Sequence, residues 1–419
     1  MNDMTRPVAL PMPTALERFL RDRLLAQLAP LRGGCLHLRD AAGDVLLGEP
    51  SAQLRVTLWV DDPAFYRAVA AQGSVGAGES YIRGDWRCSD LVALVQLLVR
   101  NRDLLDGMEG GLARIGGWLL QGWNHLRRNT REGSRRNIAA HYDLGNPFFS
   151  LFLSPDLMYS SALYASPEDT LETASQRKLA RICAQLQLTA SDHVVEIGTG
   201  WGGFALYAAG QIGCRVTTTT ISVEQYTLAK ARVEAAGLQD KVTLLLKDYR
   251  DLEGQYDKLV SIEMIEAIGA QYLETYFATL TRLLKPDGLV LLQAITIEDQ
   301  RYQQARRSVD YIKRFVFPGS FIPSINAIMA AKTRSSDLQL IDQHDFGPSY
   351  ALTLRAWRQR FLAQLPAVRA QGFDERFIRL WEFYLAYCEG GFLERSIGVS
   401  HLLMARPDYR PPLLREQAA

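Results

Sequence analysis

The sequence has few cysteines, and their arrangement indicates neither a metal site nor a disulfide framework. There are five among 419 residues, an odd number, widely scattered and without a pair at metal-ligand spacing. We therefore expect reduced thiols in a cytoplasmic protein, and no bound metal. The five are Cys35, Cys88, Cys183, Cys214 and Cys388.

Long apolar runs and a strong net charge are also missing. The chain contains no run of roughly 18 apolar residues, so no segment is expected to span a bilayer. Charged residues interrupt the first apolar segment at Glu17, Arg18 and Arg21, which argues against a signal peptide. The formal net charge is +1, so we expect no nucleic-acid partner and attribute any membrane or anion binding to local patches.

What is present at the N-terminus is a mixture of short helical and strand patterns. Apolar spacing predicts a helix over residues 15–29, and a strand is predicted over 54–60. Glycines between 76 and 84 are typical of turns, and they precede a helix predicted over 90–99. We interpret residues 1–125 as a small α+β accessory domain that contacts the membrane or a second subunit.

A basic cluster follows, opposed only by Glu132, and we interpret residues 126–140 as a linker. Two readings stay open. The cluster is a solvated charge run, or it is attracted to anionic lipid headgroups by about 1 kcal/mol per basic residue. Its arginines are Arg127, Arg128, Arg131, Arg135 and Arg136.

From about residue 181 buried strands alternate with helices. This alternation predicts a Rossmann-like α/β fold, with a mostly parallel sheet and helices on both faces. We assign residues 141–405 to this domain and 406–419 to a C-terminal tail. The predicted strands cover residues 194–197, 215–219, 242–247, 258–262 and 289–295.

The sharpest motif is a glycine-rich turn after the first of these strands, VVEIGTGWGG over residues 194–203. Gly198, Gly200 and Gly202 permit a tight turn and a close approach of the backbone to a ligand. That end of an open parallel sheet is where ligands bind, so the motif predicts a cofactor loop.

The position of the acidic residue separates two cofactor classes. A dinucleotide site places an acid about 20 positions after the glycines. Here that region is the threonine run 217–220, and the acid lies inside the first turn, at Glu196. This placement suits a cofactor with an ammonium group and no phosphate, which favours S-adenosylmethionine. Expected contacts to its ribose and adenine are Ser222, Glu224, Gln225 and Asp248.

Several ordered motifs make the sequence resemble cyclopropane-fatty-acid synthases and the related mycolic acid cyclopropane and methyl transferases. The resemblance covers about residues 135–405, and Gly78–Trp86 extend it into the N-terminal domain. It implies an S-adenosylmethionine-dependent methyltransferase that acts on a double bond of a lipid acyl chain. The motifs are Asn137–Asn146 (NIAAHYDLGN), Tyr159-Ser160, Glu196–Gly202 (EIGTGWG), Thr220–Ser222 with Gln225, Glu263–Gly269 (EMIEAIG), Gly347–Trp357 and Trp381–Phe392.

The resemblance also implies roles for individual residues. The side chains of Glu266 and Tyr350 and the main chain at Ile295 would line the reacting centre, where the family holds a bicarbonate ion as general base. The cofactor would be held by Tyr159, Ser160, Glu196, Gly198, Gly200, Trp201, Gly202, Thr220, Ser222, Gln225, Asp248 and Tyr249.

Three positions depart from the commonest pattern of the family. Ser161 replaces a cysteine, and Ala267 and Gln293 replace histidines. Together with residues 301–302 and 317–319, these changes resemble a subgroup that includes plant cyclopropane synthases. We expect Ser161 and Gln293 beside the anion, because a hydroxyl and an amide can both donate hydrogen bonds.

The chemistry sets further expectations. Methyl transfer to an alkene leaves a carbocation, which requires a closed, apolar pocket with aromatic faces. Loss of a proton from the new methyl closes a cyclopropane, whereas loss from a neighbouring carbon gives a methyl- or methylene-bearing chain, and both products stay open. Glu266 is expected to hold the bicarbonate or to be the base itself. The candidate aromatics are Tyr164, Trp201, Phe346 and Tyr350.

The expected substrate is an unsaturated phospholipid, reached by a homodimeric cytoplasmic enzyme at the inner face of the membrane. Three competing functions are an NAD(P)-dependent oxidoreductase, a membrane-binding protein with a relic fold, and an N- or O-methyltransferase of small acceptors. We expect His141 and His193 to be structural and Cys388 to be a pocket-lining thiol without a catalytic role.

Overall fold

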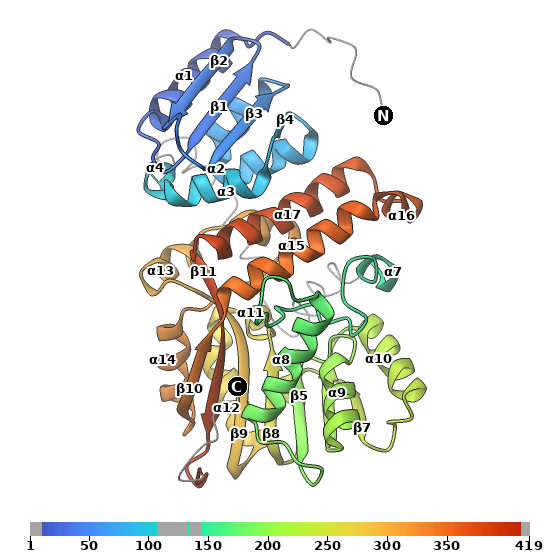
Figure 1. Ribbon diagram of the computed structural model, residues 1–419. Coiled ribbons are helices and arrows are strands. Elements are labelled where there is room, and N and C mark those ends of the chain that lie inside the picture. The colour runs from blue at the N-terminus through green and yellow to red at the C-terminus, as the bar shows by residue number, and fades with distance from the viewer. Residues whose placement is uncertain (1–10, 107–132, 134–143, 412–419) are drawn as a thin grey trace.

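The computed structural model describes residues 11–106, 133 and 144–411. They form an N-terminal domain and a larger second domain, with helix α17 (Glu375–Leu393) between the two (Figure 1). The predicted linker, apart from Gly133, lies outside the described residues, as does His141. Among the described helices, none is both long and apolar enough to cross a membrane.

The N-terminal domain is a small sheet with helices, in the strand order β2-β1-β3-β4. Strand β1 runs antiparallel to β2 and parallel to β3. Burial alternates along β3, so one face of the sheet packs into a core. The elements are α1 (Ala15–Leu28), β1 (Cys35–Asp40), β2 (Gly43–Gly48), β3 (Arg55–Val60), α2 (Ala64–Arg83), β4 (Trp86–Cys88), α3 (Leu91–Arg100) and α4 (Arg102–Asp106).

The turn predicted over residues 76–84 is wrong except at its end. Residues 76–83 belong to helix α2, which ends at Gly84, where φ is +91°. The other glycines permit close packing instead. A Cβ on Gly76 would lie 2.0 Å from the Ala68 carbonyl oxygen, and one on Gly78 would lie 2.3 Å from the Tyr311 ring. Helix α2 is interrupted once, at Gly73, where φ is +57° and ψ is −129°.

The larger domain is built on a seven-stranded sheet of described residues, in the order β10-β11-β9-β8-β5-β6-β7. The five strands from β9 to β7 are parallel, which confirms the Rossmann-like prediction. The antiparallel pair β10 and β11 was not predicted. The strands are β5 (His193–Ile197), β6 (Arg215–Thr220), β7 (Val242–Leu246), β8 (Tyr256–Ile262), β9 (Leu284–Ile297), β10 (Gln339–Asp345) and β11 (Ile397–Ala405).

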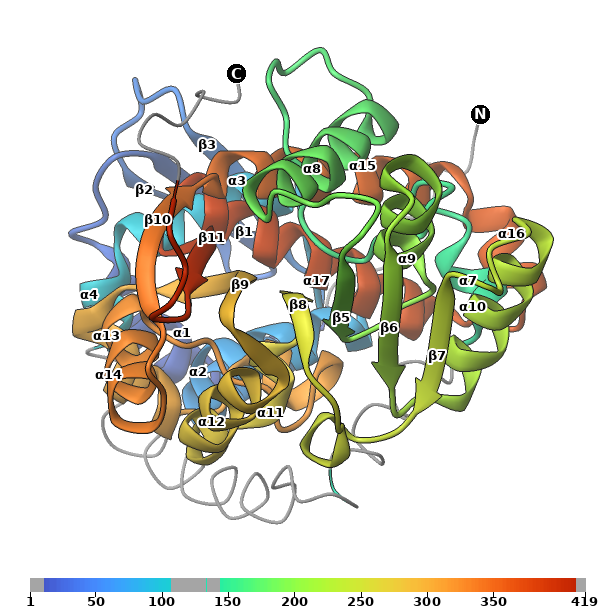
Figure 2. The same ribbon diagram turned by 90° about the horizontal axis from the view of Figure 1, so that it is seen from below.

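Helices cover both faces of this sheet, with α12 and α14 on one side and α8 on the other (Figure 2). Helices α15 and α17 pack together above the carboxyl ends of the parallel strands. The helices are α7 (Asn146–Phe149), α8 (Leu171–Gln185), α9 (Gly203–Tyr207), α10 (Val223–Ala235), α11 (Ile265–Ile268), α12 (Leu273–Leu283), α13 (Asp299–Arg307), α14 (Ile325–Ser335), α15 (Gly347–Ala363), α16 (Leu365–Ala370) and α17. Short 3₁₀ and π turns cover Ala208–Ile212, Tyr249–Asp251, Ala270–Tyr272 and Ile312–Val316.

The N-terminal domain docks on α17 through its helices α2 and α3. The Arg379 guanidinium donates to the main-chain oxygens of Tyr81, at 2.5 Å, and Trp86, at 2.6 Å. At the other end of α17, Arg100 pairs with Glu394 at 2.8 Å. Helix α17 therefore packs against the N-terminal domain as well as against its own domain.

Candidate active site

A cavity of about 680 Å³ lies at the carboxyl ends of the parallel strands, where the fold places ligand sites. It is lined by the glycine loop after β5, the end of β6, the loop after β7, helix α11 and residues of α15 and α17. One end of the cavity is formed mostly by main chain and polar groups, and the other by apolar and aromatic side chains.

The glycine loop forms the polar end. Gly200 has φ +51°, and a Cβ built on it would meet no atom within 4 Å, so the loop faces open space. Gly198 has φ +104°, and its Cβ would lie 3.2 Å from Met264. Both glycines line the cavity, which leaves room for a ligand against the backbone.

Glu196 lies at the base of this loop and is buried. Its carboxylate accepts a hydrogen bond from the Thr218 hydroxyl at 2.6 Å, and burial raises its pKa to about 8. A buried carboxyl group of this kind gains from a cationic partner, which would favour its ionised form. The geometry therefore suits the ammonium group for which Glu196 was predicted.

Beyond Glu196 the cavity is lined by Thr220, Gln225, Asp248 and Tyr249, four of the residues predicted to hold the cofactor. Two other predicted contacts lie elsewhere. Ser222 does not line the cavity, because its hydroxyl caps α10 by accepting from the Gln225 amide at 3.2 Å.

Glu224, in the first turn of α10, is exposed to solvent and also lies away from the cavity. Gly202 does not line the cavity either. It stands at the start of α9 with φ +85°, where a Cβ would lie 3.4 Å from Ala229. Gly202 therefore serves to form the turn that precedes α9.

Tyr159, Ser160 and Trp201 also line the cavity. The Tyr159 hydroxyl lies 3.0 Å from that of Tyr384 on α17. The Ser160 hydroxyl accepts a hydrogen bond of 2.7 Å from the ammonium group of Lys178, which has no exposed surface. Burial lowers the pKa of Lys178 to about 8, while Glu263 and Asp156 act to raise it.

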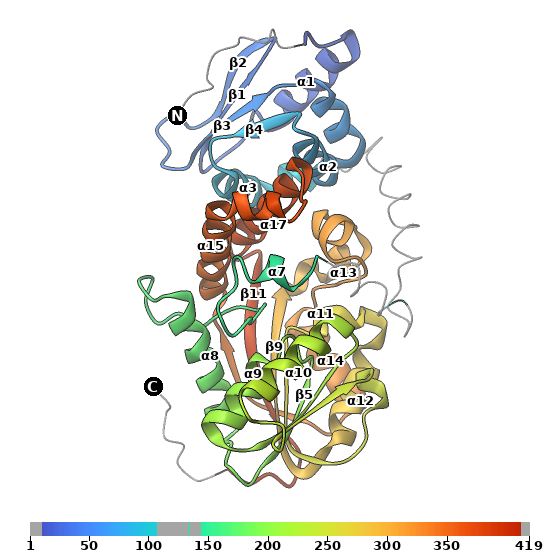
Figure 3. The ribbon, with the colours of Figure 1, turned by 90° about the vertical axis from the view of Figure 1, so that its right-hand side faces the viewer.

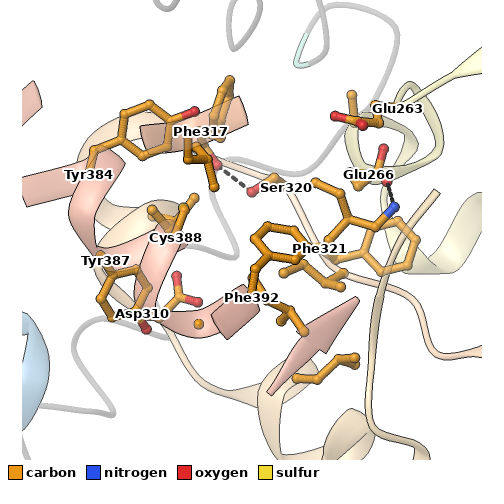
Figure 4. A pocket seen from close by; sticks show the side chains of 18 of the residues that line it. Glu263, Glu266, Asp310, Phe317, Ser320, Phe321, Tyr384, Tyr387, Cys388 and Phe392 are labelled. Carbon is orange, nitrogen blue, oxygen red and sulfur yellow. Dashed lines mark hydrogen bonds between the residues drawn. The ribbon is translucent and has the colours of Figure 1, made fainter. Parts of the chain in front are cut away.

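Glu266 lines the cavity and lies close to Glu263 (Figure 4). One carboxylate oxygen accepts from the Ile295 amide at 2.5 Å, and the other is buried without a partner among the described residues. Burial and the nearby Glu263 raise its pKa to about 8. The structure thus brings together Glu266 and the Ile295 main chain, which the sequence placed at the reacting centre.

The central group of this end was not predicted: it is Glu263. Its Oε1 accepts from the Ser161 amide at 2.9 Å and from the Gln293 side chain at 2.7 Å. Its Oε2 accepts from the Tyr350 hydroxyl at 2.6 Å. Burial raises the pKa of Glu263, whereas these donors and Lys178 act to lower it.

Ser161 and Gln293 therefore lie behind Glu263 and do not line the cavity. The Ser161 hydroxyl donates to the Ala162 carbonyl at 2.9 Å. The group of Ser161 that donates to the Glu263 carboxylate is therefore its main-chain amide and not its hydroxyl. Gln293 is oriented by His401, whose ring nitrogen lies 3.0 Å from the Gln293 Oε1. Tyr350 both bonds Glu263 and lines the cavity.

The backbone at Glu263 is unusual. It has φ +51°, a left-handed conformation that is costly for a residue with a side chain. The residue follows β8 directly, and this conformation accompanies a carboxylate that meets donors from three other segments. In the sequence, the feature that could have identified Glu263 is an acidic residue immediately after a predicted buried strand.

The apolar end of the cavity is lined by aromatic side chains of α17 and of the segment after α13 (Figure 4). Of the predicted aromatics, Trp201 and Tyr350 line it, but Tyr164 and Phe346 do not. Phe346 packs against His401 instead, at 4.7 Å between ring centres. Cys388 lines the cavity, and burial raises the pKa of its thiol, so it stays neutral. The labelled aromatics are Phe317, Phe321, Tyr384, Tyr387 and Phe392.

Comparison with known proteins agrees with this geometry. A family model described as mycolic acid cyclopropane synthetase matches residues 129–402. A tuberculostearic acid methyltransferase of Mycobacterium tuberculosis is 39% identical over 359 residues, covering 84% of this chain and 83% of the relative. The cyclopropane-fatty-acyl-phospholipid synthase of Escherichia coli K12 is 38% identical over 377 residues, covering 88% and 92%.

A solved structure agrees as well. A mycolic acid cyclopropane synthase in complex with SAH and CTAB superposes with a TM-score of 0.61 at 25% identity, covering 65% of this chain and 98% of that one. SAH is the product left when S-adenosylmethionine gives up its methyl group. The chain belongs to the mycolic acid cyclopropane synthetase family and is an S-adenosylmethionine-dependent methyltransferase.

Proposed function

We propose that this enzyme transfers the methyl group of S-adenosylmethionine to the double bond of an unsaturated phospholipid acyl chain, and that Glu263 is the base that then removes a proton. The observation that supports this is a buried carboxylate, held by three donors, at the junction of a polar and an apolar half of one cavity. The relatives' names support the lipid substrate.

A bicarbonate ion, which the family resemblance implied, does not fit these residues. The Ser161 amide, the Gln293 side chain and the Tyr350 hydroxyl would be its donors, and all three already bond Glu263. An added anion would also face the carboxyl groups of Glu263 and Glu266 in a buried site, where like charges repel strongly. We therefore assign the role of the base to the chain itself.

The two carboxyl groups have different tasks in this proposal. In this proposal Glu263 is the ionised group: burial raises its pKa, but its three donors and Lys178 favour the carboxylate, and one of its four lone-pair positions is left for the substrate proton. Glu266 is protonated at neutral pH because burial and Glu263 raise its pKa to about 8. When bound, S-adenosylmethionine supplies the electrophilic methyl group. The aromatic and aliphatic lining excludes water from the acyl cation until the proton has left.

The test uses the left-handed backbone at residue 263. Glycine adopts φ +51° without strain, so Glu263→Gly keeps the fold and leaves the three donors around an open space. We expect this variant to be inactive in bicarbonate-free buffer and to recover with formate or bicarbonate in a saturable manner. The wild-type enzyme should be indifferent to bicarbonate. Glu263→Gln, which fills the space with a neutral amide, should not recover.

The proposal fails if removal of bicarbonate stops the wild-type enzyme, or if Glu263→Gly retains most activity without an added anion. Either result would place the base elsewhere. Cofactor affinity, measured by calorimetry on the same variants, separates loss of the base from loss of binding.

We propose a cyclopropane as the product. The named relatives favour two answers, because one is a cyclopropane synthase and the other a tuberculostearic acid methyltransferase. A chain methylated without ring closure is therefore the second candidate. Both products add one carbon and two hydrogens, so mass cannot separate them. Proton NMR of the lipid can, because ring methylene protons resonate upfield of other acyl signals. Their absence would favour the second candidate.

We also propose that the enzyme works as a dimer at the membrane surface, with the N-terminal domain in contact. Helix α1 and the residues before it expose large apolar side chains, with 66% of Met12, 57% of Leu16 and 56% of Phe19 accessible. The predicted basic linker would add attraction to anionic lipid that salt weakens.

A further inference from the structure

The cavity does not end within the catalytic domain. The side chains that line it include Leu36 and Leu38 of β1, Leu58 of β3 and Leu94 of α3, all from the N-terminal domain. These residues belong to the buried face of the small sheet and the helices that cover it. One continuous space therefore has two arms, a catalytic arm and an N-terminal arm.

The two arms meet beside the break in helix α2. At Gly73, where φ is +57°, a Cβ would meet no atom within 4 Å, and the neighbouring Ser74 and Ala77 also line the cavity. At two other points the domains are in tight contact. A Cβ on Gly78 would lie 2.3 Å from Tyr311, and one on Gly390 would lie 2.6 Å from Val95. The broken part of α2 is therefore a place where the packing between the two arms is open.

The lining differs along the path. In the N-terminal arm it is apolar, which suits hydrocarbon and penalises polar groups. The junction is polar, because Arg102, Arg301 and Asp310 line it together with Ser74. Arg102 pairs there with Glu298 at 2.9 Å. Figure 3 shows α13, which carries Arg301, below α2 at this boundary.

Two apolar arms that join at a polar region match the shape of a diacyl glycerophospholipid. We propose that the N-terminal arm binds the second acyl chain of the lipid, while the catalytic arm holds the unsaturated chain and the junction holds the glycerophosphate. This rests on the proposed function and adds to it: the enzyme recognises two chains, and the N-terminal domain is part of the substrate site.

The experiment compares two lipids that share one unsaturated chain: diacyl phosphatidylglycerol and its single-chain lyso form, each in mixed micelles with a non-ionic detergent. Each methylene buried from water contributes about 0.8 kcal/mol, or roughly fourfold in affinity. Loss of the second chain should therefore lower kcat/KM of the wild-type enzyme by more than tenfold.

Two variants fill the N-terminal arm from different helices. Val69→Phe on α2 and Leu94→Trp on α3 each place an aromatic ring in the space proposed for the second acyl chain and leave the junction unchanged. We expect both to lower kcat/KM for the diacyl lipid more than tenfold and to leave the lyso lipid within twofold. Ala71→Phe is the matched control, because Ala71 lies on the same helix but is exposed and outside the cavity, and it should change neither.

Equal use of the two lipids by the wild-type enzyme would overturn the proposal, as would equal losses on both lipids in the two variants. Native mass spectrometry with added diacyl phosphatidylglycerol gives a second readout that needs no catalysis. The wild-type protein should retain the lipid and the two variants should not. Lipid retention without any methylation would contradict the proposed reaction but would still support binding of a diacyl lipid in the two arms.

Discussion

Glu263 and Glu266 show how two identical side chains acquire different properties in one cavity. The first accepts from three donors and lies near a buried lysine. The second accepts from one amide, and its other oxygen is unpartnered among the described groups. A shared site in which one group is ionised and the other protonated avoids placing two negative charges side by side.

Replacing Glu266 by glutamine tests its part in turnover. Glu266→Gln keeps the shape of the side chain but removes its titration, and we expect cofactor affinity to stay within twofold while kcat falls about 10²–10⁴-fold, as for a positioned proton-transfer group. Single-turnover kinetics and calorimetry measure the two quantities. Near-normal kcat would assign Glu266 to structure alone.

The sequence identified some of these residues and missed others for a physical reason. Glu266, Ile295 and Tyr350 lie in motifs, and the structure brings them to one end of the cavity. The role of Glu263 depends on partners at positions 161, 293 and 350, and only the fold makes these neighbours. The same holds for Lys178, which looks like an ordinary surface lysine of a helix until its burial is known.

At the scale of elements, the loop between β5 and α9 forms the cofactor end of the cavity. Gly200→Val would strain a backbone at φ +51° and project a branched side chain into space that is now open. We expect calorimetry to show no binding of S-adenosylmethionine, while circular dichroism shows an intact fold. A variant that binds normally would move the cofactor away from this loop.

The pattern of elements was predicted best where burial is uniform. Strands β5 and β9, for example, were located from their apolar runs, because both of their faces are covered. Strand β10 is mostly exposed or half-buried, and its sequence QLIDQHD has no clear alternation, so the antiparallel end of the sheet was missed. Gly78 of α2 was read as part of a turn because its packing partner, Tyr311, lies in another domain.

At the scale of the whole molecule, buried acids couple cofactor binding to protons. The pKa values of Glu196 and Glu266 are raised to about 8 from an ordinary value of 4.5. Between pH 4.5 and about pH 8, these two carboxyl groups are protonated in the folded protein but ionised in the unfolded chain. Their contribution to the free energy of unfolding of the cofactor-free enzyme therefore falls as the pH rises through this range. A cationic cofactor favours the ionised carboxylates, and its binding should release protons.

Calorimetry at pH 7 in two buffers of different ionisation enthalpy measures this release. We expect the apparent binding enthalpies to differ, and the difference to shrink in Glu196→Gln. Identical enthalpies in both buffers would mean that cofactor binding releases no net protons, which would contradict this coupling.

Helix α17 carries a further consequence for how the family diversified. One of its faces carries Tyr384 and Cys388 into the cavity, and another carries Arg379 to the N-terminal domain. The solved relative matches 65% of this chain over 98% of its own length, and the family model begins only at residue 129. In a relative without the first domain, the side of this helix that packs against that domain would face solvent. Such relatives should therefore carry polar residues at positions such as Phe383, which here packs against Tyr81 and Trp86.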